Sequence, residues 1–165
     1  MNYILYNPKS KNGKAKEIIE NIRNSYQSEY KAYNILEIDN YSELFQDITC
    51  DDEITIIGGD GTLNHFVNDI KGLEVPCKIY YHGAGTGNDF LKDIGHNSND
   101  GKLDVTKYLS NLPTATINGN EYLFINGIGF GIDGYCCEEG DRLQAKSNKP
   151  VNYTAIAIKG LLFHY

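Results

Sequence analysis

The 165-residue sequence contains no tryptophan, one methionine and no long hydrophobic run. Because no apolar stretch reaches the roughly 18 residues of a membrane span, no transmembrane segment is expected. The four cysteines form no C-x-x-C pair and have no histidines at matching spacing, which argues against a zinc site or a disulfide framework. With no signal-peptide start, the sequence predicts a cytoplasmic protein with reduced thiols.

Positive charge is also scarce, with 15 Lys and Arg residues against 22 Asp and Glu residues and a net charge of −7. A nucleic-acid surface is therefore not expected, because it would have to neutralise phosphates. The 13 tyrosines lack interleaved basic residues and suit amphipathic packing rather than base stacking. Glycine, in contrast, is abundant: there are 17, where average usage gives about 12. They concentrate at 58–61, 83–87 and 127–134, as in loops that approach a ligand.

Apolar patterning over the first 110 residues predicts alternating strands and helices. The expected strands are 2–6, 30–38, 53–57 and 78–81, and the expected helices are 14–26, 41–47 with Ser42 as N-cap, 63–70 and 88–94. This order predicts an α/β fold, in which a parallel sheet is covered by helices on both faces in a three-layer domain over 1–111.

The pattern changes after Pro113. The expected elements there are a hairpin with strands at 114–117 and 121–125, a glycine-rich stretch at 126–134, a polar segment at 138–150 and a helix at 152–163. Because a hairpin and an exposed apolar helix do not make a domain, 112–165 is expected to be the incomplete start of a second, β-rich domain.

The first glycine-rich loop, residues 58–62 (GGDGT), stands between a buried strand and a helix. Glycines there let backbone N–H groups approach an anion, and the helix N-terminus adds a positive dipole. A carboxylate in such a loop repels phosphate unless a cation lies between them, so Asp60 suggests Mg²⁺ on a nucleotide phosphate. The alternative is a tight turn in which Asp60 and Thr62 cap the helix.

A second loop of the same construction, residues 83–89 (GAGTGND), follows the next strand. Because ligands bind at the carboxyl ends of parallel strands, Asp60 and Asp89 are expected to converge in one crevice. The loop after the first strand is a third candidate. Asn7 and Ser10 could bind a nucleotide there and the nearby lysines could offset phosphate charge, although a solvated basic loop is an equal alternative.

Together these loops resemble the diacylglycerol kinase catalytic-domain family, which includes bacterial lipid kinases and sphingosine kinases. The family pattern G-G-D-G-T-x-N matches 58–64, G-T-G-N-D-F matches 85–90, and N-P-x-S-G-x-G resembles 7–13. Weaker similarities are Asp104, which is like the family's acid at the entry to the second domain, and the stretch 124–133 (FINGIGFGID).

The resemblance implies a nucleotide-binding domain followed by a β-sandwich, and an ATP-dependent lipid kinase with ATP and Mg²⁺ as cofactors. Such an enzyme transfers the γ-phosphoryl group to a hydroxyl of a diacylglycerol-like or sphingoid lipid, which implies peripheral contact with a membrane. The family's general base lies in a later part, so this chain alone is expected to be inactive. The implied nucleotide ligands are Asn7, Ser10, Gly58, Gly59, Gly61, Thr62, Asn64, Gly85, Thr86 and Gly87; the implied catalytic acids are Asp60 and Asp89, which with Asp104 surround Mg²⁺.

Two other functions stay open. NAD kinases share the Gly-Gly-Asp-Gly loop, so a kinase for a soluble acceptor is one alternative, although the motif at 85–89 favours the lipid branch. A non-catalytic nucleotide-binding or interaction module is the other. A homo-oligomer is also open, because a partner chain could complete an unpaired sheet edge.

Overall fold

The computed structural model describes residues 1–10, 17–21, 29–146 and 151–163. The chain divides into two compact units, Met1–Asn126 and Gly127–Tyr165.

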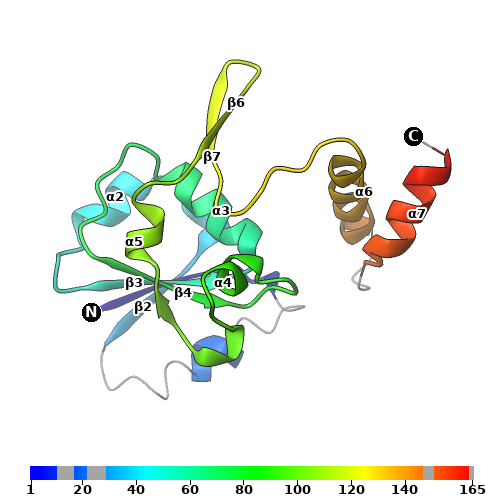
Figure 1. Cartoon of the computed structure of the whole chain (residues 1–165). Helices are drawn as coiled ribbons and strands as arrows, with labels where there is room; N and C mark the ends of the chain where they lie inside the picture. Colours follow the sequence, from blue (N-terminus) through cyan, green and yellow to red (C-terminus); the bar gives the residue numbers. More distant parts are fainter. Residues whose placement is uncertain (11–16, 22–28, 147–150, 164–165) are drawn as a thin grey trace. The chain divides into compact units, whose positions relative to one another are not determined.

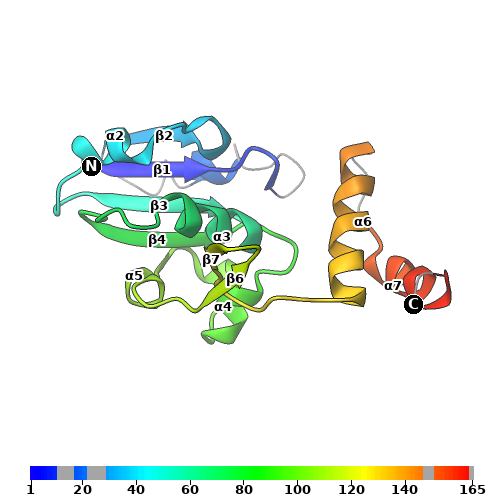
Figure 2. The ribbon, with the colours of Figure 1, turned by 90° about the horizontal axis from the view of Figure 1, so that it is seen from above.

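The first unit is built on a five-stranded sheet with the strand order β2-β1-β3-β4-β5 (Figures 1 and 2). The strands are β1 (Asn2–Tyr6), β2 (Tyr30–Asn34), β3 (Glu53–Gly58), β4 (Lys78–Gly83) and β5 (Leu103–Asp104). Strands β1 to β4 run parallel, whereas β5 pairs antiparallel with β4. The predicted α/β fold is confirmed. The antiparallel edge was not predicted, because a two-residue strand is too short to show a hydrophobic period.

Short helices connect these strands. They are α2 (Tyr41–Gln46), α3 (Asp60–Asp69), α4 (Asp89–Asp93) and α5 (Thr106–Leu109), with 3₁₀ turns η2 (Ile35–Glu37) and η3 (Ser98–Asp100). Of the helix predicted at 14–26, residues 17–21 are helical and the rest lie outside the described residues.

The predicted end of β2 and the predicted N-cap of α2 were wrong, each because an asparagine side chain binds the backbone that follows it. Asn34 accepts a hydrogen bond from the N–H of Leu36, which ends β2 and starts η2 where the sequence predicted strand to residue 38. The N-cap of α2 is Asn40 rather than Ser42, because Asn40 Oδ1 accepts from the N–H groups of Ser42 and Glu43.

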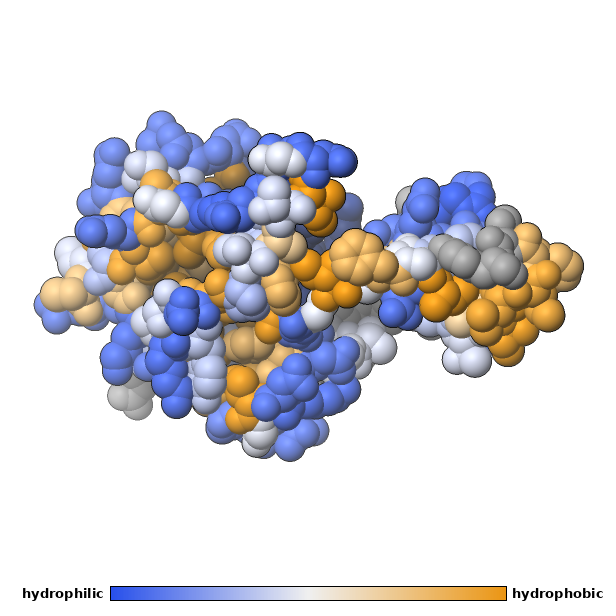
Figure 3. All heavy atoms as spheres, turned by 45° about the horizontal axis from the view of Figure 1, so that its top comes forward, coloured by the Kyte–Doolittle hydropathy of each residue, from blue (hydrophilic) through white to orange (hydrophobic). Residues whose placement is uncertain are grey.

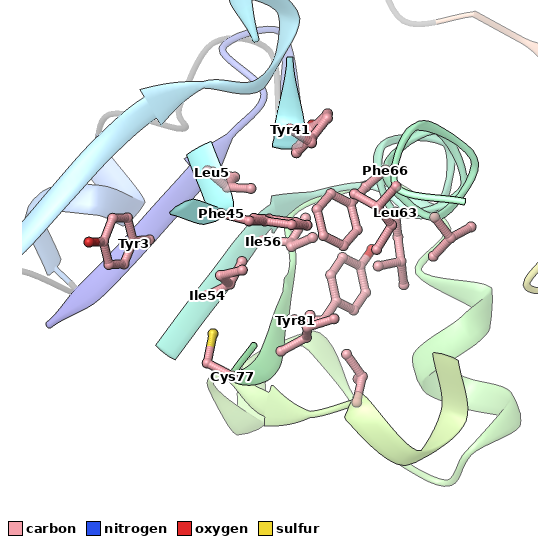
Figure 4. Packing of buried hydrophobic residues seen from close by; sticks show 14 of the residues in the cluster. Tyr3, Leu5, Tyr41, Phe45, Ile54, Ile56, Leu63, Phe66, Cys77 and Tyr81 are labelled. Atoms are coloured by element: carbon pink, nitrogen blue, oxygen red, sulfur yellow. The ribbon is translucent and has the colours of Figure 1, made fainter. Parts of the chain in front are cut away.

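The main core lies between one face of the sheet and helices α2 and α3 (Figure 4). Its labelled members are Tyr3, Leu5, Tyr41, Phe45, Ile54, Ile56, Leu63, Phe66, Cys77 and Tyr81. On the opposite face, Ile4 and Ile57 pack against Ile18 and Ile19 of the helical segment 17–21. Helices therefore cover both faces, as predicted. Each fully buried large side chain contributes about 1.5–3 kcal/mol, so this core carries most of the stability of the first unit.

Cys77 is buried in this core, and its burial raises the pKa of the thiol from 9.0 to about 11. At pH 8 an alkylating reagent is therefore expected to label the exposed Cys50 and Cys137 and to spare Cys77 until the protein unfolds, as mass spectrometry would show.

Because the folded state holds the Cys77 thiol proton more tightly than the unfolded state, the free energy of unfolding is expected to fall as pH rises from about 9 towards 11. Cys77→Ala should weaken that fall, and rapid labelling of native Cys77 would contradict its burial.

The predicted hairpin follows, made of β6 (Thr114–Ile117) and β7 (Asn120–Leu123). Its first strand has the predicted bounds, whereas the second runs from 120 to 123 rather than from 121 to 125. The two residues between its strands, Asn118 and Gly119, have φ angles of 53° and 81°. Positive φ at both central positions is the signature of a type I′ turn, which an Asn-Gly pair favours.

The hairpin belongs to the first compact unit, which ends at Asn126 rather than at the predicted domain boundary of 111. The reason is direct bonding to α3 and to the turn that follows it. Asn68 binds the backbone of Leu123, and Lys71 pairs with Glu121 at 2.7 Å. The compact unit thus extends beyond the alternating β-α pattern. The predicted domain boundary between residues 111 and 112 stays a prediction.

The described part of the second unit consists of helices α6 (Ile132–Lys146) and α7 (Tyr153–Phe163). The helix predicted at 152–163 is confirmed. The polar segment predicted at 138–150 is instead helical as far as Lys146, and 147–150 lie outside the described residues. Between 127 and 163 the described residues include no strand, so only the hairpin matches the predicted β-rich start.

Apolar side chains gather at the surface over α7 (Figure 3). Leu161, Leu162 and Phe163 are 60%, 68% and 75% exposed. None of the described helices combines the length and the apolar character that crossing a membrane requires.

Candidate functional site

The first glycine-rich turn joins β3 to α3. The helix begins at Asp60 rather than at residue 63 as predicted, so residues 60–62 form its first turn. Its N-cap is Gly59, whose carbonyl accepts from the N–H of Thr62 at 2.9 Å, and none of the described side chains caps this end. The first N–H groups of a helix have no partner within it. An uncapped helix start with an exposed Gly61 is suited to bind an anion.

The two glycine-rich turns meet backbone to backbone, which explains two of their glycines. A Cβ on Gly85 would lie 2.7 Å from Gly59 Cα, and a Cβ on Gly59 would lie 3.1 Å from Gly85 Cα. The Gly58 carbonyl also accepts from the N–H of Ala84 at 2.7 Å and from the Tyr81 hydroxyl at 3.0 Å. The predicted convergence of the turns at one edge of the sheet is thus present in the structure.

Asp60 connects the two turns. Its Oδ2 accepts from the N–H of Asp89 at 3.0 Å and its Oδ1 from the N–H of Phe90 at 3.1 Å. The carboxylate therefore caps α4, the helix after the second turn, rather than the helix in which it lies. This bonding differs from both sequence-based interpretations, yet a carboxylate has about four acceptor positions, so two stay available for a cation or its waters.

The carboxylates of Asp60 and Asp89 lie close to Gly87. A Cβ on Gly87 would be 3.1 Å from Asp89 Oδ2 and 3.6 Å from Asp60 Oδ2, which places these two oxygens within about 7 Å of each other. Asp89 Oδ1 also accepts from Lys92 Nζ at 2.9 Å, and this bond raises the pKa of Lys92. Two carboxylates at this spacing fit a hydrated Mg²⁺, which keeps several waters and takes one or two carboxylates.

Asp104 does not join the other two acids. It lies on β5 opposite Tyr80, three residues before the end of β4 at Gly83 and so about 10 Å along the strand. Its carboxylate accepts from the N–H and hydroxyl of Thr106 and lies 3.7 Å from Lys78 Nζ. Burial alone would raise the pKa of Asp104, but the contacts with Thr106 and Lys78 outweigh burial, so the net effect is a lowered pKa. No group of three potential ligands gathers among the described residues.

The loop after β1 reaches the first turn through Asn7. Its Nδ2 donates to Thr62 Oγ1 at 2.9 Å, and its Oδ1 accepts from the N–H of Lys9 at 2.9 Å. Ser10 donates its N–H to the Asn7 carbonyl at 3.0 Å. The structure thus brings Asn7 to the first turn and binds Ser10 to Asn7, while residues 11–16, with their three lysines, lie outside the described residues.

Asn88 closes the second turn, although it was not among the predicted site residues. It adopts a left-handed conformation, with φ 50° and ψ 46°. Its Oδ1 accepts from the Gly85 N–H at 2.9 Å, while its Nδ2 donates to the Gly85 carbonyl at 3.0 Å. Thr86 is left exposed at the tip of the turn. An asparagine between glycine and a helix start was the available signal, since asparagine tolerates this conformation.

Asn64, predicted to hold the nucleotide, binds the protein's own backbone through its side-chain oxygen, and its nucleotide role stays a prediction. Its Oδ1 accepts from the N–H of Ile125 at 3.3 Å. Among the predicted site residues, the structure brings together those of the two turns and Asn7, and Ser10 is bonded to Asn7. Asp104 is apart from them, and the Asn64 side chain has a backbone partner.

The sheet topology and the two glycine-rich turns are those of an α/β domain. In this class of domain, ligands bind at the carboxyl edge of a largely parallel sheet. The family model described as "Diacylglycerol kinase catalytic domain" matches residues 2–116, and the chain belongs to this family. The resemblance predicted from the motifs is thereby confirmed.

Individual relatives agree with the family. The chain is 33% identical over 81 residues to a protein of Staphylococcus haemolyticus named "putative lipid kinase", covering 47% of this chain and 26% of the relative. Two solved structures titled "putative diacylglycerol kinase" from Bacillus anthracis have TM-scores of 0.52 and 0.51 at 18% identity, a likeness that shows the fold. They match 99% and 98% of this chain, which spans 56% and 55% of their length.

Proposed function

We propose that this chain forms the nucleotide-binding part of an ATP-dependent lipid kinase. The observation that carries the proposal is the contact between two glycine-rich turns, which sets the uncapped start of α3 beside the Asp60 and Asp89 carboxylates. Phosphoryl transfer depends on positioning and on neutralising phosphate charge rather than on covalent chemistry by the protein. Turns of this kind suit the first task, and a cation near the two acids suits the second.

Each residue then has a stated task. The triphosphate would bind the N–H groups of Gly59 and Gly61 beside Thr62, whose own N–H donates to the Gly59 carbonyl, with Gly85–Gly87 and the Thr86 hydroxyl on its other side. Asp60 and Asp89 would hold Mg²⁺, and the bound ion would neutralise phosphate charge. Asn7 positions Thr62 through its side-chain amide.

The acceptor in this proposal is a hydroxyl of a diacylglycerol-like or sphingoid lipid presented at a membrane surface. The family assignment favours this acceptor over NAD. No residue of this chain is assigned as general base. The chain alone is therefore expected to bind Mg·ATP without turning over lipid.

Titration of the ¹⁵N-labelled chain with Mg·ATP tests the nucleotide site. Amide signals of Gly59, Gly61, Thr86 and Asp89 are expected to shift, while that of Gly119 in the hairpin turn stays in place. Because the phosphates supply the main contacts, adenosine should bind at least tenfold more weakly than Mg·ATP. Unmoved signals at both turns would refute the proposal, and equal affinity for adenosine would refute the phosphate contacts.

A further inference from the structure

Asn68 of α3 binds the chain where it leaves the hairpin. Its Oδ1 accepts from the N–H of Leu123 at 2.9 Å, and its Nδ2 donates to the Leu123 carbonyl at 2.9 Å and to the Asn64 carbonyl at 2.8 Å. One side-chain amide thus satisfies both backbone groups of Leu123, as a residue of an adjacent strand would.

Two further asparagines extend this attachment towards the candidate site. Asn64, one helical turn before Asn68, binds the N–H of Ile125. With its amide in the orientation that satisfies both polar atoms, Asn126 donates to the Ile125 carbonyl and accepts from the N–H of Phe90, each at 3.1 Å. The Phe90 N–H is the same group that donates to Asp60 Oδ1.

Residues 123–126, here called the strap, are therefore fastened to both helices that begin at the glycine-rich turns. The apolar side chains of the strap, Leu123 and Ile125, pack against the main core. This packing alone would keep the strap on the core, even without the polar contacts. The polar contacts fix the register of the strap. Register matters because a one-residue slip in an extended segment turns its apolar side chains away from the core. Only in the observed register does Asn126 reach the start of α4.

We infer that Asn64 and Asn68 are positioning residues for the candidate site. They hold the strap in register, and the strap brings the Asn126 amide oxygen to the Phe90 N–H, which Asn126 and Asp60 share at the first turn of α4. Asn64 thus acts on nucleotide binding through the strap rather than by contact with the nucleotide. The effect on ligand affinity rests on the proposed function, whereas the effect on α4 does not.

The inference is tested first without ligand, in Asn68→Ala of the full chain. Hydrogen exchange of the Leu123 N–H is expected to accelerate at least tenfold, and the amide signal of Phe90 is expected to shift. Lys71→Ala is the matched control: it removes the contact of Lys71, two residues after the end of α3, with Glu121 of β7 but leaves the strap intact, so the Phe90 signal should not move. If Leu123 exchange accelerates in Asn68→Ala while Phe90 is unmoved, Asn68 is only a structural contact and the inference is wrong.

A second measurement separates the inference from the proposed function. At a temperature where both proteins are fully folded, Asn68→Ala is expected to bind Mg·ATP about tenfold more weakly than wild type. If wild type itself does not bind Mg·ATP, the proposed function fails while the Phe90 signal still decides the inference. Should Asn68→Ala not fold, Asn64→Ala breaks only the weaker Ile125 bond and is expected to shift Phe90 in the same direction; no shift would overturn the inference.

Discussion

Gly85→Ala is expected to destabilise the first unit severely, by about 3 kcal/mol or more, because the added methyl would enter the backbone of the facing turn. The new Cβ would lie 2.7 Å from Gly59 Cα. Both atoms are fixed by the backbone, so no side-chain rotation can separate them. Such a loss is a large fraction of the 5–15 kcal/mol that typically holds a domain together. Urea unfolding followed by circular dichroism measures it.

Gly61→Ala is the matched control, since it makes the same chemical change in the first turn. A Cβ on Gly61 meets nothing within 4 Å. Alanine also favours helix over glycine by up to about 1 kcal/mol, so the free energy of unfolding should be unchanged or higher. The exposed methyl at the helix start is nevertheless expected to weaken Mg·ATP binding about tenfold or more. Equal destabilisation by the two variants would contradict the back-to-back contact of the turns.

Asp60→Asn is expected to remove most of the Mg²⁺ dependence of ATP binding while keeping most of the stability. The amide retains one of the two oxygens that cap α4, so one of the two capping bonds is kept, but it loses the negative charge that a cation needs. In wild type, Mg²⁺ should raise the affinity for ATP about tenfold or more; in the variant the ratio should approach one. Calorimetric titration with and without Mg²⁺ gives both affinities. Asp60→Ala removes the cap of α4 as well as the charge, so its free energy of unfolding should be about 2 kcal/mol lower than that of wild type.

Asp104→Asn provides the comparison for the charge effect. Asp104 is held by Thr106 and Lys78, away from the turns, so its neutralisation is expected to leave the Mg²⁺ dependence unchanged. An unchanged ratio in Asp60→Asn would show that Asp60 acts only as a helix cap. Loss of the ratio in Asp104→Asn would show that the acid belongs to the cation site after all.

Local patterns predicted most of the first unit. The strand at 53–57 was recognisable because a buried parallel strand is a continuous run of β-branched residues, and the hairpin because Asn118-Gly119 suits a type I′ turn. The two glycine-rich turns were recognisable for a similar reason, since each lies between a strand and a helix. Helix α6 was missed, because glycines and charged residues hide a helical period.

The order of strands and helices, the composition of both turns and membership of the family could all be inferred from the residues alone, since periodicity and motifs involve neighbours along the chain. The partners of the acids and asparagines could not. Asp60 bonds to the backbone 29 residues later and Asn64 to the backbone 61 residues later. Such contacts exist only once the strands have taken their order in the sheet and the helices have packed on it. For the same reason, only the folded chain separates Asp104 from the site and joins the hairpin to α3.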